Sequence, residues 1–266
     1  MRINERQYHS PKINLQETTF LNMPIHNLEK EEVLKKIYEL SDEKKFSYVV
    51  TPNLDHITRN YESKDIDKYE NADLSICDSK VVSIIYKAIY KKKLHVNPGS
   101  DLTKDLLKEE NKKKNKSSIT IIGCQVKQIK KLREMFENIT FNHLNPSYGF
   151  INKKHEVNEI CKFIKEHPSK FILLCVGSPQ QEILANEMKL KEIPGTALCV
   201  GASINFITGI EKRAPSIYQK LALEWLFRTF VNPKKMIPRY TKCALDLTKI
   251  SLKISLRTIQ NATVKK

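Results

Sequence analysis

The fold is decided by residues 171–190, which have the sequence FILLCVGSPQQEILANEMKL. Residues 171–176 form a continuous apolar run of strand length, which is typical of a strand buried on both faces of a parallel sheet. Gly177, Ser178 and Pro179 interrupt the run, and a helix-like segment follows at 180–190. This part of the chain therefore predicts a buried strand followed at once by a helix.

The same unit recurs on both sides of this stretch. Apolar runs of strand length precede helix-like segments at FSYVV (46–50), LSIC (74–77), SITIIG (118–123) and TALCVG (196–201). A further helix-like segment, LEKEEVLKKIYELSDEKK, occupies residues 28–45. Strands that alternate with helices predict an α/β fold with a doubly wound, mainly parallel, Rossmann-like sheet.

The positive charge of the chain is unevenly distributed. The 266 residues carry a net charge of +16, and residues 211–266 contain 13 Lys+Arg against 3 Asp+Glu. The last 56 residues therefore carry +10 and the preceding 210 residues carry +6. We predict an α/β catalytic domain over residues 1–210 and a basic C-terminal appendage over residues 211–266.

The appendage has two segments with amphipathic character. SIYQKLALEWLFRTF (216–230) predicts one long helix that ends before Asn232-Pro233, and ALDLTKISLKISLRTI (244–259) fits a helix better than a strand. A basic, amphipathic tail with aromatic residues favours binding to an anionic membrane surface. A solvated helix packed on the core and a nucleic-acid-binding tail are the alternatives.

Several other classes of protein are disfavoured. The longest apolar runs are far shorter than the roughly 20 residues of a membrane-spanning helix. The polar N-terminus, MRINERQYHSPKINLQ (1–16), lacks a secretory signal, so we expect a cytoplasmic protein. Neither the seven His nor the six Cys pair at metal-ligand spacing, and no dinucleotide or P-loop motif is present.

Polar residues gather where the predicted strands meet their helices. In parallel sheets, ligands bind beyond these carboxyl ends, where helix N-termini favour anions. Taken singly, the junctions fit helix caps: Thr51-Pro52, Ser100-Asp101, and a Ser178–Gln181 capping box with Pro179 at the first helical position. Capping does not account for Asn53, Asp55, Asp78 and Asn205 together, so the edge predicts a site for a substrate with phosphates and sugar hydroxyls. The candidate residues are Thr51, Asn53, Asp55, Asp78, Ser100, Asp101, Gly177, Gln181, Gly201 and Asn205.

The junctions and the tail together resemble the WecG/TagA/CpsF glycosyltransferases of bacterial cell-envelope polysaccharide synthesis. The resemblance spans about residues 15–240, and its GSPQQE and tail elements are specific. Its motifs are TPNLDHI (51–57), Asp78-Ser79, PGSDLT (98–103), YGF (148–150), GSPQQE (177–182), Arg213-Ala214-Pro215, LEWLFR (223–228), Pro233 and Arg239-Tyr240.

The resemblance implies transfer of a sugar, commonly N-acetylmannosamine, from a UDP-sugar donor to a polyprenyl-diphosphate-linked acceptor. Inversion is implied, and neither a metal nor another cofactor is expected. UDP-glucose or a UDP-uronic acid is the alternative donor, and a basic nucleic-acid-binding protein is the distant alternative function. The appendage would bring the enzyme to the inner face of the cell membrane.

The resemblance also implies roles for individual residues. Asp78 falls on the family's base, and Thr51, Asn53 and Gln181 fall on residues that orient substrate. We also consider Arg213, Arg228 and Arg239 candidates for stabilising the leaving diphosphate; contact with phospholipid headgroups or a structural ion pair is the alternative role of each. Two positions depart from the family pattern, since Ser79 replaces a Gly and Asn205 replaces an Asp.

Overall fold

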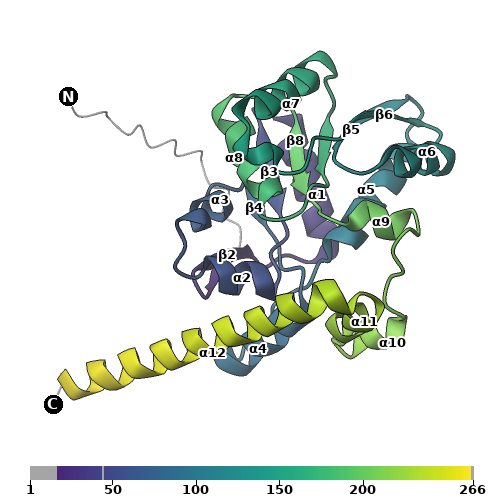
Figure 1. The fold of residues 1–266 in the computed structure, drawn as a ribbon. Coiled ribbons are helices and arrows are strands. Elements are labelled where there is room, and N and C mark those ends of the chain that lie inside the picture. Colours follow the sequence, from purple (N-terminus) through teal and green to yellow (C-terminus); the bar gives the residue numbers. More distant parts are fainter. Residues whose placement is uncertain (1–16, 44, 265–266) are drawn as a thin grey trace, which may run out of the picture.

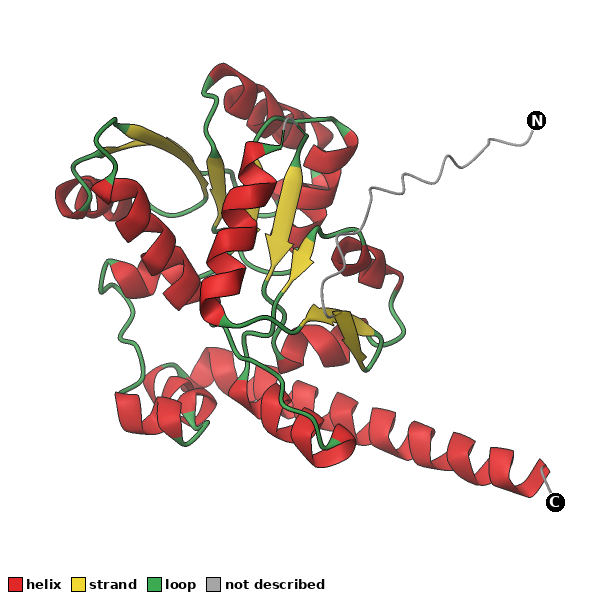
Figure 2. Cartoon of the chain, turned by 180° about the vertical axis from the view of Figure 1, so that it is seen from behind, coloured by secondary structure: helices red, strands yellow, loops and turns green. Residues whose placement is uncertain are grey.

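A computed structural model describes residues 17–43 and 45–264 of the chain. The polar segment 1–16, used above to argue against a secretory signal, lies outside the described residues. Within the described part, helices flank both faces of a parallel sheet, as Figures 1 and 2 show. The α/β, Rossmann-like prediction is therefore confirmed.

The sheet has six parallel strands in the order β4-β3-β8-β7-β5-β6. Val50 pairs with both Ser75 and Cys199, and Cys199 also pairs with Leu174, so four strands end level with one another. This register puts the following loops along one edge. The strands are β3 (Ser47–Val50), β4 (Leu74–Ser75), β5 (Ser117–Ile122), β6 (Ile139–Leu144), β7 (Phe171–Leu174) and β8 (Thr196–Cys199).

Two apolar layers enclose the sheet, one on each face. The first contains buried residues of α1 (Lys30–Asp42), α5 (Gly99–Lys112), α6 (Val126–Met135) and α9 (Ser203–Ile207). The second contains buried residues of α2 (Leu54–Asn60), α3 (Asp67–Glu70), α4 (Lys80–Tyr90), α7 (Lys154–Glu166) and α8 (Gln180–Leu190). Because helices cover both faces of the sheet, its central strands are continuously apolar.

Two strand elements escaped the sequence argument. β6 is an edge strand with one exposed side, so its sequence ITFNHL lacks the continuous apolar run of the central strands. The other is the hairpin of β1 (Glu17–Phe20) and β2 (Met23–His26). Its turn places Leu21 and Asn22 at positive φ, the geometry of a type I′ turn, without the Asn-Gly pair that usually signals one.

Over residues 211–264, the described part of the appendage, the chain forms three helices: α10 (Ser216–Lys220), α11 (Glu224–Val231) and α12 (Pro233–Val264). The prediction of one helix over 216–230 is wrong, because Ala222 takes a left-handed conformation (φ 61°) between α10 and α11. The helix predicted at 244–259 is confirmed as part of α12. No helix in residues 17–43 and 45–264 combines the length and the apolar character needed to cross a bilayer.

The N-terminal half of α12 packs against α2 in the core (Figure 1). Met236, Cys243 and Ile250 are buried at seven-residue intervals, so they form one stripe along the helix. Thr58 Oγ1 of α2 donates to Cys243 Sγ at 3.6 Å. Beyond this contact α12 projects past the body of the molecule.

Candidate active site

Asp78 stands at the junction between β4 and α4, on the edge where the strands end. Its Oδ1 accepts the backbone N–H of Gly99 at 2.7 Å. Burial raises the pKa of the Asp78 carboxyl to about 7, although the Gly99 N–H and the charge of Arg228 both favour the carboxylate. Ser79 caps α4 by accepting the Val82 N–H, so the helix start fixes the position of Asp78. Asp78 is thus a carboxyl group suited to exchange a proton near neutral pH.

The appendage brings Arg228 toward Asp78. Arg228 lies on α11, where it pairs with Glu224 at 2.6 Å and lies 5.0 Å from the centre of the Phe206 ring. Both contacts orient the guanidinium, and its charge lowers the pKa of Asp78 against the effect of burial. The appendage therefore contributes a cation to the site formed by the core.

Thr51 follows β3 and connects two junctions. Its Oγ1 donates to the carbonyl of Cys199 at 3.1 Å, and the side chain is buried. A Cβ added to Gly99 would lie 3.0 Å from Thr51 Oγ1, so the glycine permits this close approach. Thr51 therefore packs against Gly99, and the backbone N–H of Gly99 bonds Asp78.

Gln181 connects the β7–α8 junction to the β8–α9 junction. The side chain is buried, its Oε1 accepts the Gly201 N–H at 2.9 Å, and its Nε2 donates to Glu182 Oε1 at 2.8 Å. Gly201 (φ 52°) and Gly177 (φ 81°) both take the left-handed conformation that glycine tolerates. Gly177, Gln181 and Gly201, three of the candidate residues, therefore lie at the same edge of the sheet.

The capping box predicted for α8 is wrong. Pro179 is the N-cap residue, no side chain caps the helix, and Ser178 Oγ instead accepts from Arg59 at 2.6 Å. Tertiary partners have replaced the local bonds of Ser178 and Gln181. Both residues hold neighbouring elements together rather than closing their own helix.

The caps predicted at Thr51-Pro52 and Ser100-Asp101 are wrong as well. Asn53 caps α2, accepting the N–H groups of Asp55 and His56 at 3.1 and 3.3 Å. Pro98 is the N-cap residue of α5, which begins at Gly99 and has no side-chain cap. Ser100 is half-buried in the first turn of that helix. Helix capping thus accounts for Asn53, although the sequence analysis had counted Asn53 among the residues that capping does not explain.

Two further predicted arginines form ion pairs with predicted carboxylates. Arg239 Nη2 lies 2.9 Å from Asp55 Oδ2, which ties α12 to α2. Arg213 binds Asp101 with both terminal nitrogens, and its Nη2 lies 2.7 Å from Asp101 Oδ2. Partial burial alone would raise the pKa of Asp101, but the Arg213 guanidinium holds it below its usual range. These pairs dock the appendage on the core.

Asn205 is directed toward other partners. Its Oδ1 accepts from Gln128 Nε2 of α6, and its Nδ2 donates to Glu211 Oε1 at 2.8 Å. Both ends of the amide are therefore used within the protein. Neither of these hydrogen bonds goes to Asp78, Gly99 or Thr51.

The sequence argument missed three groups at this edge. The backbone N–H of Gly99 bonds the proposed base, Glu182 orients Gln181, and Arg59 connects Asp55 to Ser178. The four-residue spacing of Asp55 and Arg59 could have indicated their ion pair, which measures 3.4 Å. The bonds from Gly99 to Asp78 and from Arg59 to Ser178 join residues far apart in the sequence, so they depend on the tertiary fold.

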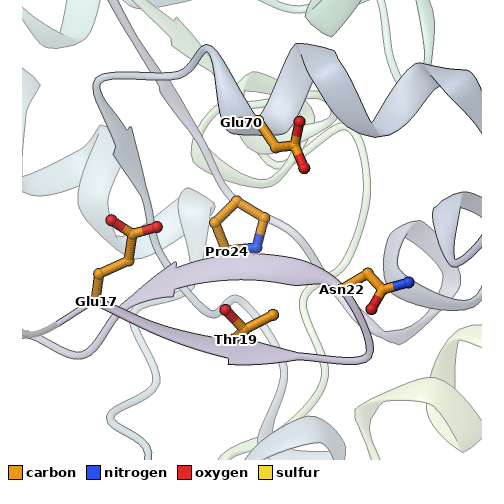
Figure 3. A pocket seen from close by; sticks show the side chains of 5 residues that line it. All are labelled: Glu17, Thr19, Asn22, Pro24 and Glu70. Atoms are coloured by element: carbon orange, nitrogen blue, oxygen red, sulfur yellow. The ribbon is translucent and has the colours of Figure 1, made fainter. Parts of the chain in front are cut away.

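A pocket of about 500 Å³ lies elsewhere, between the β1–β2 hairpin and α3 (Figure 3). None of the predicted site residues lines it. Two carboxylates at its wall, Glu17 and Glu70, would repel a diphosphate. The edge of the sheet, rather than this pocket, carries the groups suited to an anionic sugar substrate.

The fold and this edge define a Rossmann-like α/β protein with its site at the carboxyl ends of the strands. Residues 18–261 match the Glycosyl transferase WecG/TagA/CpsF family, and the chain belongs to that family. The match extends through the core and most of α12. Membership of the family that the sequence resembled is thus confirmed.

Curated relatives from Staphylococcus aureus are similar to part of the chain. The proteins of strains NCTC 8325 / PS 47 and MW2 are both named N-acetylglucosaminyldiphosphoundecaprenol N-acetyl-beta-D-mannosaminyltransferase. Each is 28% identical over 148 residues, which cover 53% of this chain and 55% of the relative. The chain thus spans about half the length of the curated relatives it matches.

Proposed function

We propose that this chain is an inverting glycosyltransferase that moves N-acetylmannosamine from a UDP-sugar to a polyprenyl-diphosphate-linked saccharide. The product would enter a cell-envelope polysaccharide or a teichoic-acid-type polymer. Family membership supports the reaction class, and the names of the Staphylococcus aureus relatives support the sugar and the lipid-linked acceptor. The observation that carries the proposal is a half-buried Asp78 with a pKa of about 7 at the strand edge.

In the proposed reaction Asp78 is the general base. The acceptor hydroxyl loses its proton to the Asp78 carboxylate while its oxygen attacks the anomeric carbon, and the bond from that carbon to the UDP oxygen breaks. A single displacement of this kind inverts the anomeric centre. A positioned base of suitable pKa contributes roughly 10²–10⁴-fold to such a step. The Gly99 N–H fixes one carboxylate oxygen, so the other can face the acceptor.

The leaving UDP carries its charge on the diphosphate. In this proposal Arg228 and the helix N-termini along the edge stabilise that charge without a metal ion. Arg213 and Arg239 either bind the diphosphate in addition to their carboxylate partners or only hold the appendage in place. Thr51, Asn53 and Gln181 shape the substrate site through the bonds described above.

The acceptor's lipid requires the enzyme to work at a membrane. We propose that residues 211–266 form the unit that binds the anionic inner face of the cell membrane, whereas residues 1–210 form the catalytic unit. Exposed Leu245, Leu252 and Leu256 on α12 support this role, together with the basic residues around them.

The test is transfer by wild type and the Asp78→Asn variant, with a polyprenyl-diphosphate-linked N-acetylglucosamine acceptor. We expect Asp78→Asn to lose at least about 100-fold in rate, because the amide cannot accept the proton. A urea unfolding curve checks that the variant is folded. Transfer at the wild-type rate would overturn the role of Asp78.

The donor is tested with a panel of UDP-sugars that includes UDP-N-acetylmannosamine, UDP-glucose and a UDP-uronic acid. We expect turnover with UDP-N-acetylmannosamine. Efficient use of another sugar in its place would keep the reaction class and correct the donor.

A further inference from the structure

The C-terminal end of α4 exposes apolar side chains to solvent. Ile84 and Ile89 are 59% and 58% exposed, and residues 87–93 are all exposed. Val82 and Tyr86 pack in the core on the side opposite Ile84, whereas Ile89 lies on the side of Val82 but is exposed near the end of the helix. The last turns of α4 therefore leave apolar side chains uncovered on two sides.

Lysines surround this apolar end. The 20 residues 79–98 contain five lysines and no acidic residue, so they carry five of the six net positive charges of residues 1–210. Lys80, Ile84, Lys87 and Lys91 share one helix face because they are three or four residues apart. The surplus charge of the core is therefore concentrated around α4.

This end of α4 and the appendage occupy the same side of the molecule. Figures 1 and 2 show α4 beside α12 along the lower edge of the fold, in both views. α12 exposes Leu252 and Leu256 to about the same degree as the isoleucines of α4, at 60% and 61%. One flat surface could thus contact both helices.

We propose that residues 84–93, the end of α4 and the turn after it, form a second membrane contact that belongs to the core. Ile84 and Ile89 enter the interfacial layer, and Lys87 and residues 91–93 pair with anionic headgroups. The choice of a membrane rests on the proposed function, because its acceptor is a lipid.

The same contact would place the base near the lipid surface. α4 begins two residues after Asp78 and has 11 residues, which span roughly 16 Å at 1.5 Å per residue. Asp78 would then lie within about that distance of the headgroups, where the acceptor's diphosphate and sugar are located.

The chemistry favours lipid over single-stranded nucleic acid. Nucleic-acid binding of this kind uses exposed aromatic rings on which bases stack. On α4, Tyr86 is buried, and Tyr90 is 45% exposed but packs on Tyr86 with ring centres 4.7 Å apart, so α4 presents no series of open rings. The exposed isoleucines offer apolar contact but no stacking surface.

The first experiment is co-sedimentation of the full chain with vesicles of phosphatidylcholine and phosphatidylglycerol in equal amounts. The test variant is the triple Lys91→Glu, Lys92→Glu, Lys93→Glu. The matched control is the triple Lys127→Glu, Lys130→Glu, Lys131→Glu on α6, whose lysines are also exposed but which covers β6 at the far edge of the sheet. Both triples change the net charge equally.

We expect the α4 triple to lose at least about tenfold in affinity for these vesicles, and the α6 triple to lose much less. Equal losses would mean that only net charge matters and would overturn the proposal. Unchanged binding by the α4 triple would overturn it as well. The proposal would also be overturned if the α4 triple lost binding to a single-stranded oligonucleotide while its vesicle binding stayed intact.

The apolar part is tested separately. Ile84→Ser combined with Ile89→Ser should weaken vesicle binding at least about fivefold, since each isoleucine buries apolar surface in the interface. Val126→Ser is the control, because Val126 is 75% exposed on α6. Wild-type binding by the double variant would show that the isoleucines stay in water and would overturn their insertion.

Transfer to a short-chain, water-soluble acceptor separates this proposal from the proposed function. The α4 variants should keep wild-type rates in that assay, because none of their residues belongs to the site. Failure of Asp78→Asn to reduce transfer would count against the proposed function alone. Wild-type vesicle binding by the α4 variants would count against the second contact alone.

Discussion

Asp78 Oδ1 accepts the backbone N–H of Gly99 at 2.7 Å, and this bond joins the end of β4 to the first turn of α5. The two residues are separated by the whole of α4 and the loop after it. Because Gly99 has no side chain, Thr51 packs directly above it, 3.0 Å from where a Cβ would lie. The segments that follow β3, β4 and α4 therefore lie together at Asp78 and Gly99.

This environment predicts how transfer depends on pH. Only the carboxylate form of Asp78 can take a proton, and burial places its pKa at about 7. We expect kcat/KM to rise with pH through about 7 and then to level off. Arg228→Gln should move the inflection upward, since the guanidinium favours the carboxylate. A flat profile across pH 7 would contradict the assignment, and Arg257→Gln, an exposed position on α12, is the control.

The same pKa predicts that Asp78 destabilises the fold above neutral pH. Between the ordinary value of 3.8 and about 7, the folded chain holds a proton on Asp78 that the unfolded chain releases. The contribution of Asp78 to stability therefore falls as pH rises through this window. We expect Asp78→Asn to unfold at higher urea concentration than wild type above pH 7, with the difference vanishing near pH 3.8. Identical curves at every pH would rule this out.

Gln181→Ala tests the contact between the β7 and β8 junctions. The substitution removes the acceptor of the Gly201 N–H and leaves the buried Glu182 without its amide donor. We expect a loss of about 1–3 kcal/mol in the free energy of unfolding, measured in urea, together with slower transfer. Gln180→Ala, at the neighbouring half-buried position, should cost much less. Equal losses at the two positions would argue against a specific role for Gln181.

The ion pair between Arg239 and Asp55 predicts energetic coupling between α12 and α2. A double-mutant cycle with alanine at each position should give a coupling of about 1 kcal/mol in unfolding, reduced by added salt. The control pair is Lys253 of α12 and Glu62, which lies two residues after the end of α2; both are about half exposed, so they should couple more weakly. Couplings of equal size would mean that burial does not strengthen the inner pair.

The central strands were predictable because each is buried on both faces and therefore apolar without interruption. β6 and the β1–β2 hairpin were not, since one has an exposed side and the other has an uncommon turn sequence. The break at Ala222 was also hidden, because the apolar spacing of 216–230 continues across it. The local sequence pattern therefore predicts which residues are buried, but it does not predict where the backbone reverses its direction.

At the site, the sequence spacing did not correctly predict which polar residues cap helices. Ser178 and Gln181 have the spacing of a capping box, yet they bond Arg59 and Gly201 from other elements. Asn53, placed beyond capping by the sequence argument, is the cap of α2. A side chain near a helix start can bond locally or across the fold, and spacing alone does not distinguish the two.

The sequence by itself determined the parallel α/β sheet, the polar strand-to-helix junctions and the concentration of charge in the tail. Apolar runs and charged side chains can be located from the order of the residues alone. Only the tertiary structure decided that Gly99 bonds Asp78, that the charge of Arg228 of the appendage acts on the same carboxyl, and that Arg213 and Arg239 pair with Asp101 and Asp55. These partners are far apart along the chain. Their contacts depend on the strand register and on the docking of α11 and α12, which no local pattern specifies.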